Sequence, residues 1–188
     1  MPMSQPHPRL SNSLHGHKKI SSRLILNFAA NRLPHALLLI GPKGIGKSTL
    51  AYHLACHVLS QKQHGAMLSL QSGREISEAT FEIDQSISDL VAAKSHVDLF
   101  VIEKSINPKT GRPRQEITVD AARQLKQFFS LTAVSSLWRV AIIDAVDEMN
   151  QNAANAILKA LEDPPKHTLL ILISHTHNLW LETISSRC

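Results

Sequence analysis

Short apolar runs recur along the chain, and each is typical of a strand buried on both faces of a parallel sheet. The runs lie at 36–40, 97–102, 138–144 and 168–173. Around them, apolar residues recur with the spacing of helix faces. We expect these helices at 20–31, 48–59, 119–129 and 150–163, with weaker candidates within 75–92 and 179–185. Strands alternating with helices predict an α/β domain built on a central parallel sheet.

Proline, glycine and polar residues mark the segments between these elements. Residues 1–12 carry three prolines and predict a flexible tail, so the folded domain is expected to span 13–188. Pro34 ends the first helix, because proline disfavours continuation and restricts the preceding residue. The basic stretch 104–114 predicts an exposed loop. It is either a solvated connection or a contact with a phosphate backbone or a partner.

The segment after the first strand, Gly41–Ser48, matches the phosphate-binding pattern G-x-x-x-x-G-K-[ST]. It follows a buried strand and precedes a helix, which is the context the motif needs. Glycines with positive φ let successive N–H groups turn inward around an anion, and the helix adds its positive dipole end. A glycine-rich turn without a ligand is the alternative. The predicted nucleotide-binding residues are Gly41, Pro42, Lys43, Gly44, Ile45, Gly46, Lys47, Ser48 and Thr49.

A magnesium site is predicted where two of the strands end. Lys47 is suited to the β and γ phosphates, and the Ser48 hydroxyl is placed to ligate the Mg²⁺ that bridges them. The run 138–144 ends in Asp144, whose carboxylate would lie at the carboxyl edge of the sheet beside the phosphate-binding loop. Ser48 and Asp144 are therefore expected to form the two halves of one Mg²⁺ site. Ser174 and Thr176 follow the last strand and would lie next to the γ-phosphate.

Composition excludes several classes of protein. Hydrophobic residues make up 43% of the chain and charged residues 19%, as in an ordinary globular protein. No apolar run reaches the roughly 20 residues of a membrane helix, and the N-terminus lacks a secretory signal, so a cytoplasmic location is expected. The net charge of +5 makes contact with DNA plausible, but aromatic residues, at 4%, are too few to suggest a base-stacking platform.

Cysteine and histidine do not form a metal pattern. Cys56 and Cys188 are the two cysteines of the chain, too few for a disulfide framework or a metal cluster. The histidine pairs at 15/17 and 175/177 each lack a third ligand and lie far apart in the sequence. We therefore expect no zinc site.

With these stretches in hand, the sequence resembles the clamp loader subunits of bacterial DNA polymerase III, which are AAA+ proteins, and among them the delta-prime subunits. The resemblance runs from about Leu14 to the end of the chain. Its most specific parts are the helix and prolines at 152–165 and the terminal motif Ser186-Arg187-Cys188.

The resemblance implies an AAA+ three-layer sandwich that binds ATP or ADP with Mg²⁺. It implies a place in a hetero-oligomeric ring with the motor and delta subunits, which loads the sliding clamp onto DNA as part of a DNA polymerase holoenzyme. By the same resemblance Arg187 is an arginine finger that acts in trans on the ATP of a neighbouring motor subunit, and His17 lies on the adenine side of the nucleotide.

The sequence departs from the family pattern at particular positions. Hydrolysing members carry a glutamate after the aspartate that ends the third strand, and this chain has Ala145, so we expect ATP binding with little or no hydrolysis. Residues 61–98 contain no cysteine, so the zinc module of many members is not expected. The chain stops at Cys188, and we expect the lid and collar domains to be absent from it.

Other functions remain open at this point. An active ATPase of another AAA+ branch, such as a helicase or remodelling motor, would need turnover by the isolated chain, which Ala145 argues against. A small-molecule or nucleoside kinase would need an arginine-bearing lid and a substrate pocket, and we see neither pattern. An assembly module with a vestigial phosphate loop is the non-catalytic alternative.

Overall fold

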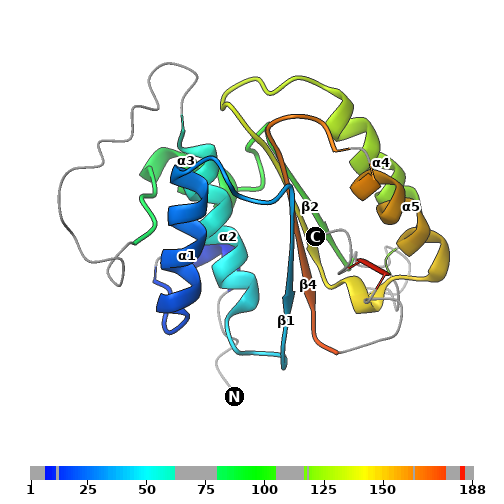
Figure 1. The fold of residues 1–188 in the computed structure, drawn as a ribbon, viewed down its shortest axis with the longest axis horizontal. Coiled ribbons are helices and arrows are strands. Elements are labelled where there is room, and N and C mark those ends of the chain that lie inside the picture. Colours follow the sequence, from blue (N-terminus) through cyan, green and yellow to red (C-terminus); the bar gives the residue numbers. More distant parts are fainter. Residues whose placement is uncertain are drawn as a thin grey trace.

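The structure is a computed structural model, and it describes residues 7–11, 13–61, 80–104, 117, 119–162, 164–176 and 183–184. Its elements follow the order expected of an α/β domain (Figure 1). The strands are β1 (Ala36–Ile40), β2 (Leu99–Glu103), β3 (Arg139–Asp144) and β4 (Thr168–Ser174). The helices are α1 (Lys18–Ala29), α2 (Lys47–Leu59), α3 (Gln85–Ala92), α4 (Val119–Ser130) and α5 (Gln151–Glu162), with short 3-10 helices η1 (Pro8–Leu10) and η3 (Val146–Glu148).

The sheet of the described part is parallel throughout, with strand order β1-β4-β3-β2. β4 therefore lies between the strand that leads into Gly41 and the strand that ends at Asp144. Ile40 pairs with Ser174, and Asp144 pairs with Ile173. Because parallel strands end at the same edge, this register brings the ends of β1, β3 and β4 together.

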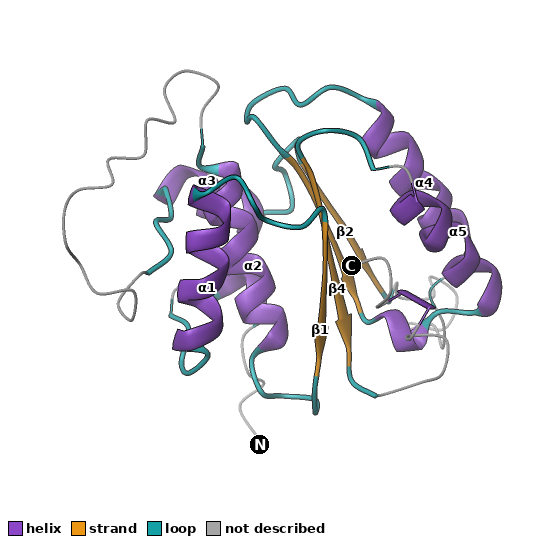
Figure 2. Ribbon diagram, viewed as in Figure 1, coloured by secondary structure: helices purple, strands orange, loops and turns teal. Residues whose placement is uncertain are grey.

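Helices cover both faces of the sheet, as the predicted three-layer sandwich requires. Figures 1 and 2 show α1, α2 and α3 on one face and α4 and α5 on the other. Side chains alternate along β3, so that Ile142 belongs to the core under α2 and Ile143 to the core under α4 and α5. All of β4 is buried, in keeping with the uninterrupted apolar run 169–173 within it.

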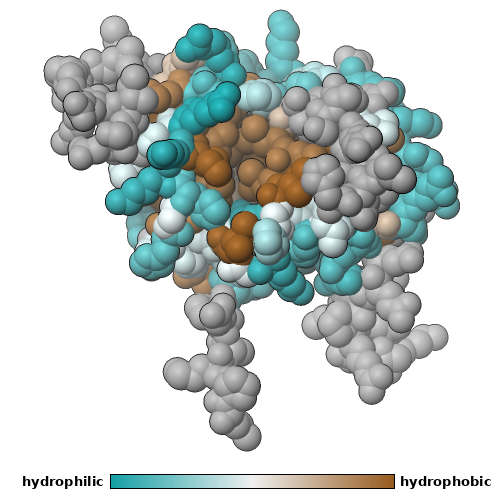
Figure 3. Space-filling model, turned by 60° about the horizontal axis from the view of Figure 1, so that its bottom comes forward, coloured by the Kyte–Doolittle hydropathy of each residue, from teal (hydrophilic) through white to brown (hydrophobic). Residues whose placement is uncertain are grey.

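The edge strand β1 keeps part of its apolar surface exposed. Leu37, Leu38 and Leu39 are half-buried, and Ile40 is 39% exposed. Hydrophobic side chains gather in the middle of the face that includes the carboxyl edge of the sheet, with hydrophilic ones around them (Figure 3).

Most predicted elements are present with shifted ends. β1 has the predicted bounds, whereas β2 begins at Leu99 rather than residue 97, and α3 occupies only the last part of the candidate 75–92. The stretch 179–185 and most of the loop 104–114 lie largely outside the described residues, as do His177, Arg187 and Cys188.

The described part of the predicted flexible tail is packed against the domain. Residues 8–10 form η1, and the Arg9 Nε donates a hydrogen bond to the Ala92 carbonyl oxygen at 3.1 Å. His7 Nε2 lies 3.3 Å from the Glu103 carboxylate at the end of β2. These polar contacts join His7 and Arg9 to the ends of β2 and α3, whereas the prolines and polar residues predicted a loose segment.

Among the described residues, none of the helices has both the length and the apolar character that crossing a membrane would require.

A buried histidine in the last turn of α2, His57, predicts a loss of stability in mild acid. His57 is 2% exposed and packs edge-on against Phe28, and burial lowers its pKa below 6.5. Below pH 6.5, His57 therefore binds a proton more readily in the unfolded chain than in the folded chain. The free energy of unfolding should fall as the pH is lowered through this range, by up to about 1.4 kcal/mol per pH unit. Denaturant titrations between pH 7.5 and 5, with His57→Gln as the comparison, measure this slope, and an equally steep fall in the variant would contradict it.

Candidate nucleotide-binding site

The loop Gly41–Gly46 has the backbone shape that the motif predicts. Gly44 and Gly46 have φ of 86° and 93°, in the left-handed region that side chains rarely adopt. Gly46 also lies close to the imidazole ring of His17, since a Cβ at position 46 would be 3.5 Å from His17 Nε2. The helix α2 begins at the next residue, so its N-terminal N–H groups point toward the loop. The middle of the loop, from Pro42 to Ile45, is exposed.

The predicted phosphate-binding lysine lies within this loop. Lys47 is 5% exposed, and its Nζ donates hydrogen bonds of 2.7 Å to the carbonyl oxygens of Gly41 and Pro42. Burial lowers the pKa of Lys47, while the carboxylates of Asp144 and Asp147 act in the opposite direction. The ammonium group is therefore held by loop carbonyl oxygens and lies within the electrostatic reach of two carboxylates.

The two predicted halves of the magnesium site are in direct contact. Ser48 Oγ donates a hydrogen bond of 2.6 Å to Asp144 Oδ2, although 96 residues separate them in the sequence. Hydroxyl and carboxylate oxygens are the hard ligands that Mg²⁺ prefers, so this pair fits the ion. Thr49, the next residue, is half-buried in the first turn of α2. Ala145 follows Asp144 and is 1% exposed, so no carboxylate stands at that position.

The end of β4 lies between the phosphate-binding loop and Asp144. We call residues Ser174–Thr176 the β4 tip. The Gly41 N–H donates to the Ser174 carbonyl oxygen at 3.3 Å, and His175 Nε2 lies 3.9 Å from Asp144 Oδ1. The two hydroxyls predicted to meet the γ-phosphate are both engaged within the protein. Ser174 is fully buried and donates to the Thr176 carbonyl oxygen at 2.7 Å, and Thr176 Oγ1 donates to Asp147 Oδ2 at 3.1 Å.

His175 is thus the side chain of the β4 tip that faces the predicted metal ligand, and sequence reasoning missed it. The sequence places His175 among the polar residues after the last strand but does not predict its proximity to Asp144. The feature of the sequence that could have identified His175 is its position directly after a buried strand. Among the residues that the structure describes, groups of three or more His, Cys, Asp or Glu side chains that could hold a metal ion do not occur.

His17 contacts the loop from the N-terminal side. Its Nε2 lies 2.6 Å from the Ile45 carbonyl oxygen, and its backbone has φ of 57°. The structure thus brings His17 to the phosphate-binding loop, and its predicted place beside adenine stays a prediction.

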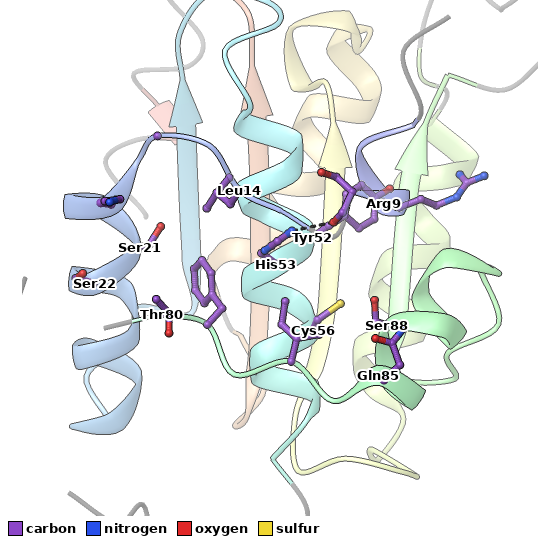
Figure 4. Close-up of a pocket in the computed structure, with 15 residues that line it drawn as sticks. Arg9, Leu14, Ser21, Ser22, Tyr52, His53, Cys56, Thr80, Gln85 and Ser88 are labelled. Carbon is purple, nitrogen blue, oxygen red and sulfur yellow. Dashed lines mark hydrogen bonds between the residues drawn. The ribbon is translucent and has the colours of Figure 1, made fainter. Parts of the chain in front are cut away.

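A separate cavity of about 750 Å³ is lined by the N-terminal segment, α1, α2 and residues 80–88 (Figure 4). Tyr52, His53 and Cys56 of α2 line it, and His53 Nε2 lies 2.9 Å from the Ser11 carbonyl oxygen. None of the residues of Gly41–Ser48 is among its lining residues. Gly16 lines the cavity while its neighbour His17 contacts the loop, so the N-terminal segment runs between the two.

Comparison with known proteins gives a consistent picture. The sequence profile of the family described as DNA polymerase III, delta subunit, matches residues 16–188. The delta-prime subunit of DNA polymerase III from Pseudomonas aeruginosa is 38% identical over 154 residues, which cover 82% of this chain and 41% of that protein. The delta-prime subunit from Bacillus subtilis is 30% identical, covering 90% of this chain and 45% of that protein.

A solved structure supports the fold. The crystal structure of a DNA polymerase III gamma subunit-related protein from Thermotoga maritima superposes with a TM-score of 0.57 at 18% identity, over 89% of this chain and 43% of that one. The chain spans less than half the length of each of these relatives. By its profile match and its curated relatives, the chain belongs to the DNA polymerase III delta subunit family, in agreement with the predicted resemblance to delta-prime subunits.

Proposed function

We propose that this chain is the nucleotide-binding core of a clamp loader subunit in DNA replication. In this proposal it binds ATP with Mg²⁺, hydrolyses it weakly or not at all, and donates Arg187 to the ATP of a neighbouring motor subunit in a hetero-oligomeric ring. The ring, which includes a delta subunit, loads the sliding clamp onto DNA, and a cytoplasmic location is part of the proposal. The observation that carries it is the 2.6 Å contact between Ser48 and Asp144 beside a phosphate-binding loop.

The residues of the loop would bind the triphosphate in a defined way. The N–H groups of the loop and of the start of α2 donate to phosphate oxygens. Lys47 would exchange the carbonyl oxygens of Gly41 and Pro42 for phosphate oxygens, and Ser48 and Asp144 would hold the Mg²⁺. Bound Mg²⁺ supplies charge neutralisation between the phosphates.

Weak hydrolysis follows from the residue after Asp144. General base catalysis needs an acceptor within hydrogen-bond reach of the attacking water. Ala145 offers no such group, and its methyl group is buried. Glu148 is engaged at 3.0 Å with Lys104. The chain would then keep ATP as a bound ligand and act on its neighbour through Arg187.

One set of measurements tests this function. We expect ATP to bind the chain in a Mg²⁺-dependent manner with near-background turnover. In the assembled complex, Arg187→Ala should lower ATP turnover, in part rather than wholly, because the chain contributes one of several interfaces. Arg123→Ala removes an exposed arginine of α4 and serves as the control.

Three outcomes would contradict the proposal at different points. Rapid turnover by the chain alone would favour an active motor of another AAA+ branch. Failure to bind ATP would favour an assembly module. Full activity of the Arg187→Ala complex would remove the role in trans.

A further inference from the structure

The β4 tip is held in place by a carboxylate that the predicted chemistry leaves without a role. Asp147 lies in η3, directly after the strand that ends at Asp144. Its Oδ1 accepts a hydrogen bond of 3.1 Å from the backbone N–H of His175, and its Oδ2 accepts one of 3.1 Å from Thr176 Oγ1. One side chain thus binds both a main-chain and a side-chain donor of the tip.

The two acidic residues of η3 point in different directions. Glu148 pairs with Lys104 at 3.0 Å, away from the β4 tip. Asp147 contacts the tip, and its charge acts on the Lys47 ammonium within the phosphate-binding loop. The neighbouring carboxylate of Glu148 therefore provides an internal comparison for Asp147.

The hydrogen bond to the His175 backbone N–H fixes the main chain from which the imidazole extends. With its N–H held by Asp147, His175 directs Nε2 to a position 3.9 Å from Asp144 Oδ1. On the other side of the tip, the carbonyl oxygen of Ser174 accepts a hydrogen bond from the Gly41 N–H. The tip is therefore fixed between the carboxylate of Asp147 and the start of the phosphate-binding loop.

We propose that Asp147 is a positioning residue for recognition of the γ-phosphate. By holding the β4 tip, it keeps the His175 ring at the point where Asp144 and the third phosphate of a bound triphosphate would meet. This inference rests on the proposed nucleotide binding. A diphosphate lacks the group that the tip faces, so the role of Asp147 should be specific to ATP.

The ratio of ADP to ATP dissociation constants tests the inference. In titrations of the full chain with Mg²⁺, Asp147→Ala should weaken ATP binding by about tenfold, the effect of losing a charge-assisted pair of hydrogen bonds. ADP binding should change little, so the ratio falls. Asp147→Asn keeps one acceptor oxygen and should fall between the two. Glu148→Ala, in the same turn, should leave the ratio unchanged.

A second measurement does not depend on nucleotide. Amide hydrogen exchange at His175 should be faster in Asp147→Ala, because its acceptor is gone, and unchanged in Glu148→Ala. If Asp147→Ala fails to fold, Thr176→Val removes the other donor and should lower the ratio in the same direction.

The outcomes separate this inference from the proposed function. An unchanged ratio in Asp147→Ala, or an equal loss of ATP and ADP binding, overturns the positioning role and leaves nucleotide binding intact. If Asp147→Ala does not fold, an unchanged ratio in Thr176→Val overturns it. Absence of ATP binding by the unsubstituted chain overturns both.

Discussion

Replacing Lys47 with alanine is expected to weaken ATP binding by roughly 100-fold. The side chain is almost fully buried in the loop, where its ammonium already contacts the carbonyl oxygens of Gly41 and Pro42. Alanine removes the cation that would bind the phosphates and also the two hydrogen bonds that hold the loop closed around it. Both losses lower the affinity for any nucleotide. Isothermal titration of the full chain with Mg²⁺-ATP measures the effect.

A lysine of the same loop provides the matched comparison. Lys43 carries the same charge but is exposed, and Lys43→Ala should weaken binding by no more than about threefold, as expected for a solvent-screened charge. Equal effects of the two substitutions would mean that Lys47 acts only through net charge. The phosphate-binding role assigned to the loop would then be wrong.

The loop Gly41–Ser48 and its contact with Asp144 could be predicted because each segment is marked locally in the sequence. The apolar run 36–40 ends at the first glycine of the loop, and β1 has those bounds. The strand that ends in Asp144 is marked in the same way, and the contact of Asp144 with Ser48 confirms that the two segments converge.

Residues at the β4 tip could not be assigned in the same way, because their partners depend on strand order. Placing β4 between β1 and β3 brings His175 to Asp144 and Asp147 to Thr176. The pattern of residues along one strand does not reveal which strands lie beside it in the sheet. The hydroxyls of Ser174 and Thr176 are predicted to lie next to the γ-phosphate, and the sequence pattern does not reveal that both donate to protein oxygens.

The burial of α2 also exceeds what its periodicity predicts. One apolar face was expected, yet the polar residues His53 and His57 are buried as well. The N-terminal segment covers His53 through the carbonyl oxygen of Ser11, and Glu82 covers His57. Both covering segments come from outside the helix, so a helical pattern cannot reveal them.

The carboxylate of Asp98 organises the amino edge of the sheet, opposite the candidate nucleotide site. Asp98 lies just before β2 and is fully buried. It accepts backbone N–H hydrogen bonds of 2.7 to 3.0 Å from Val134, Ser135 and Ser136, which lead into β3. Burial alone would raise its pKa, but these hydrogen bonds outweigh burial and lower it. The side chain therefore stays ionised and fixes the loop before β3.

The partner charge of Asp98 is also buried. Arg139 Nη2 lies 3.7 Å from Asp98 Oδ1, and its guanidinium stacks over the Phe128 ring at 4.6 Å while donating to the Phe128 carbonyl oxygen. Arg139 is only 5% exposed. Removing the carboxylate would leave the loop N–H groups without their acceptor and this buried cation without its counter-charge.

Asp98→Ala is therefore expected to lower the free energy of unfolding by about 3–5 kcal/mol, the range found when one partner of a buried ion pair is removed. Asp98→Asn keeps the shape and one acceptor oxygen, so it should cost less. Asp120→Ala makes the same substitution in a surface pair with Arg123, where both side chains are more than 70% exposed, and should cost less than about 1 kcal/mol. Urea titrations at pH 7 measure all three. If Asp98→Ala cost no more than Asp120→Ala, the loop before β3 would owe its position to the apolar contacts of Phe128 and Trp138, and the buried carboxylate would contribute little to the fold.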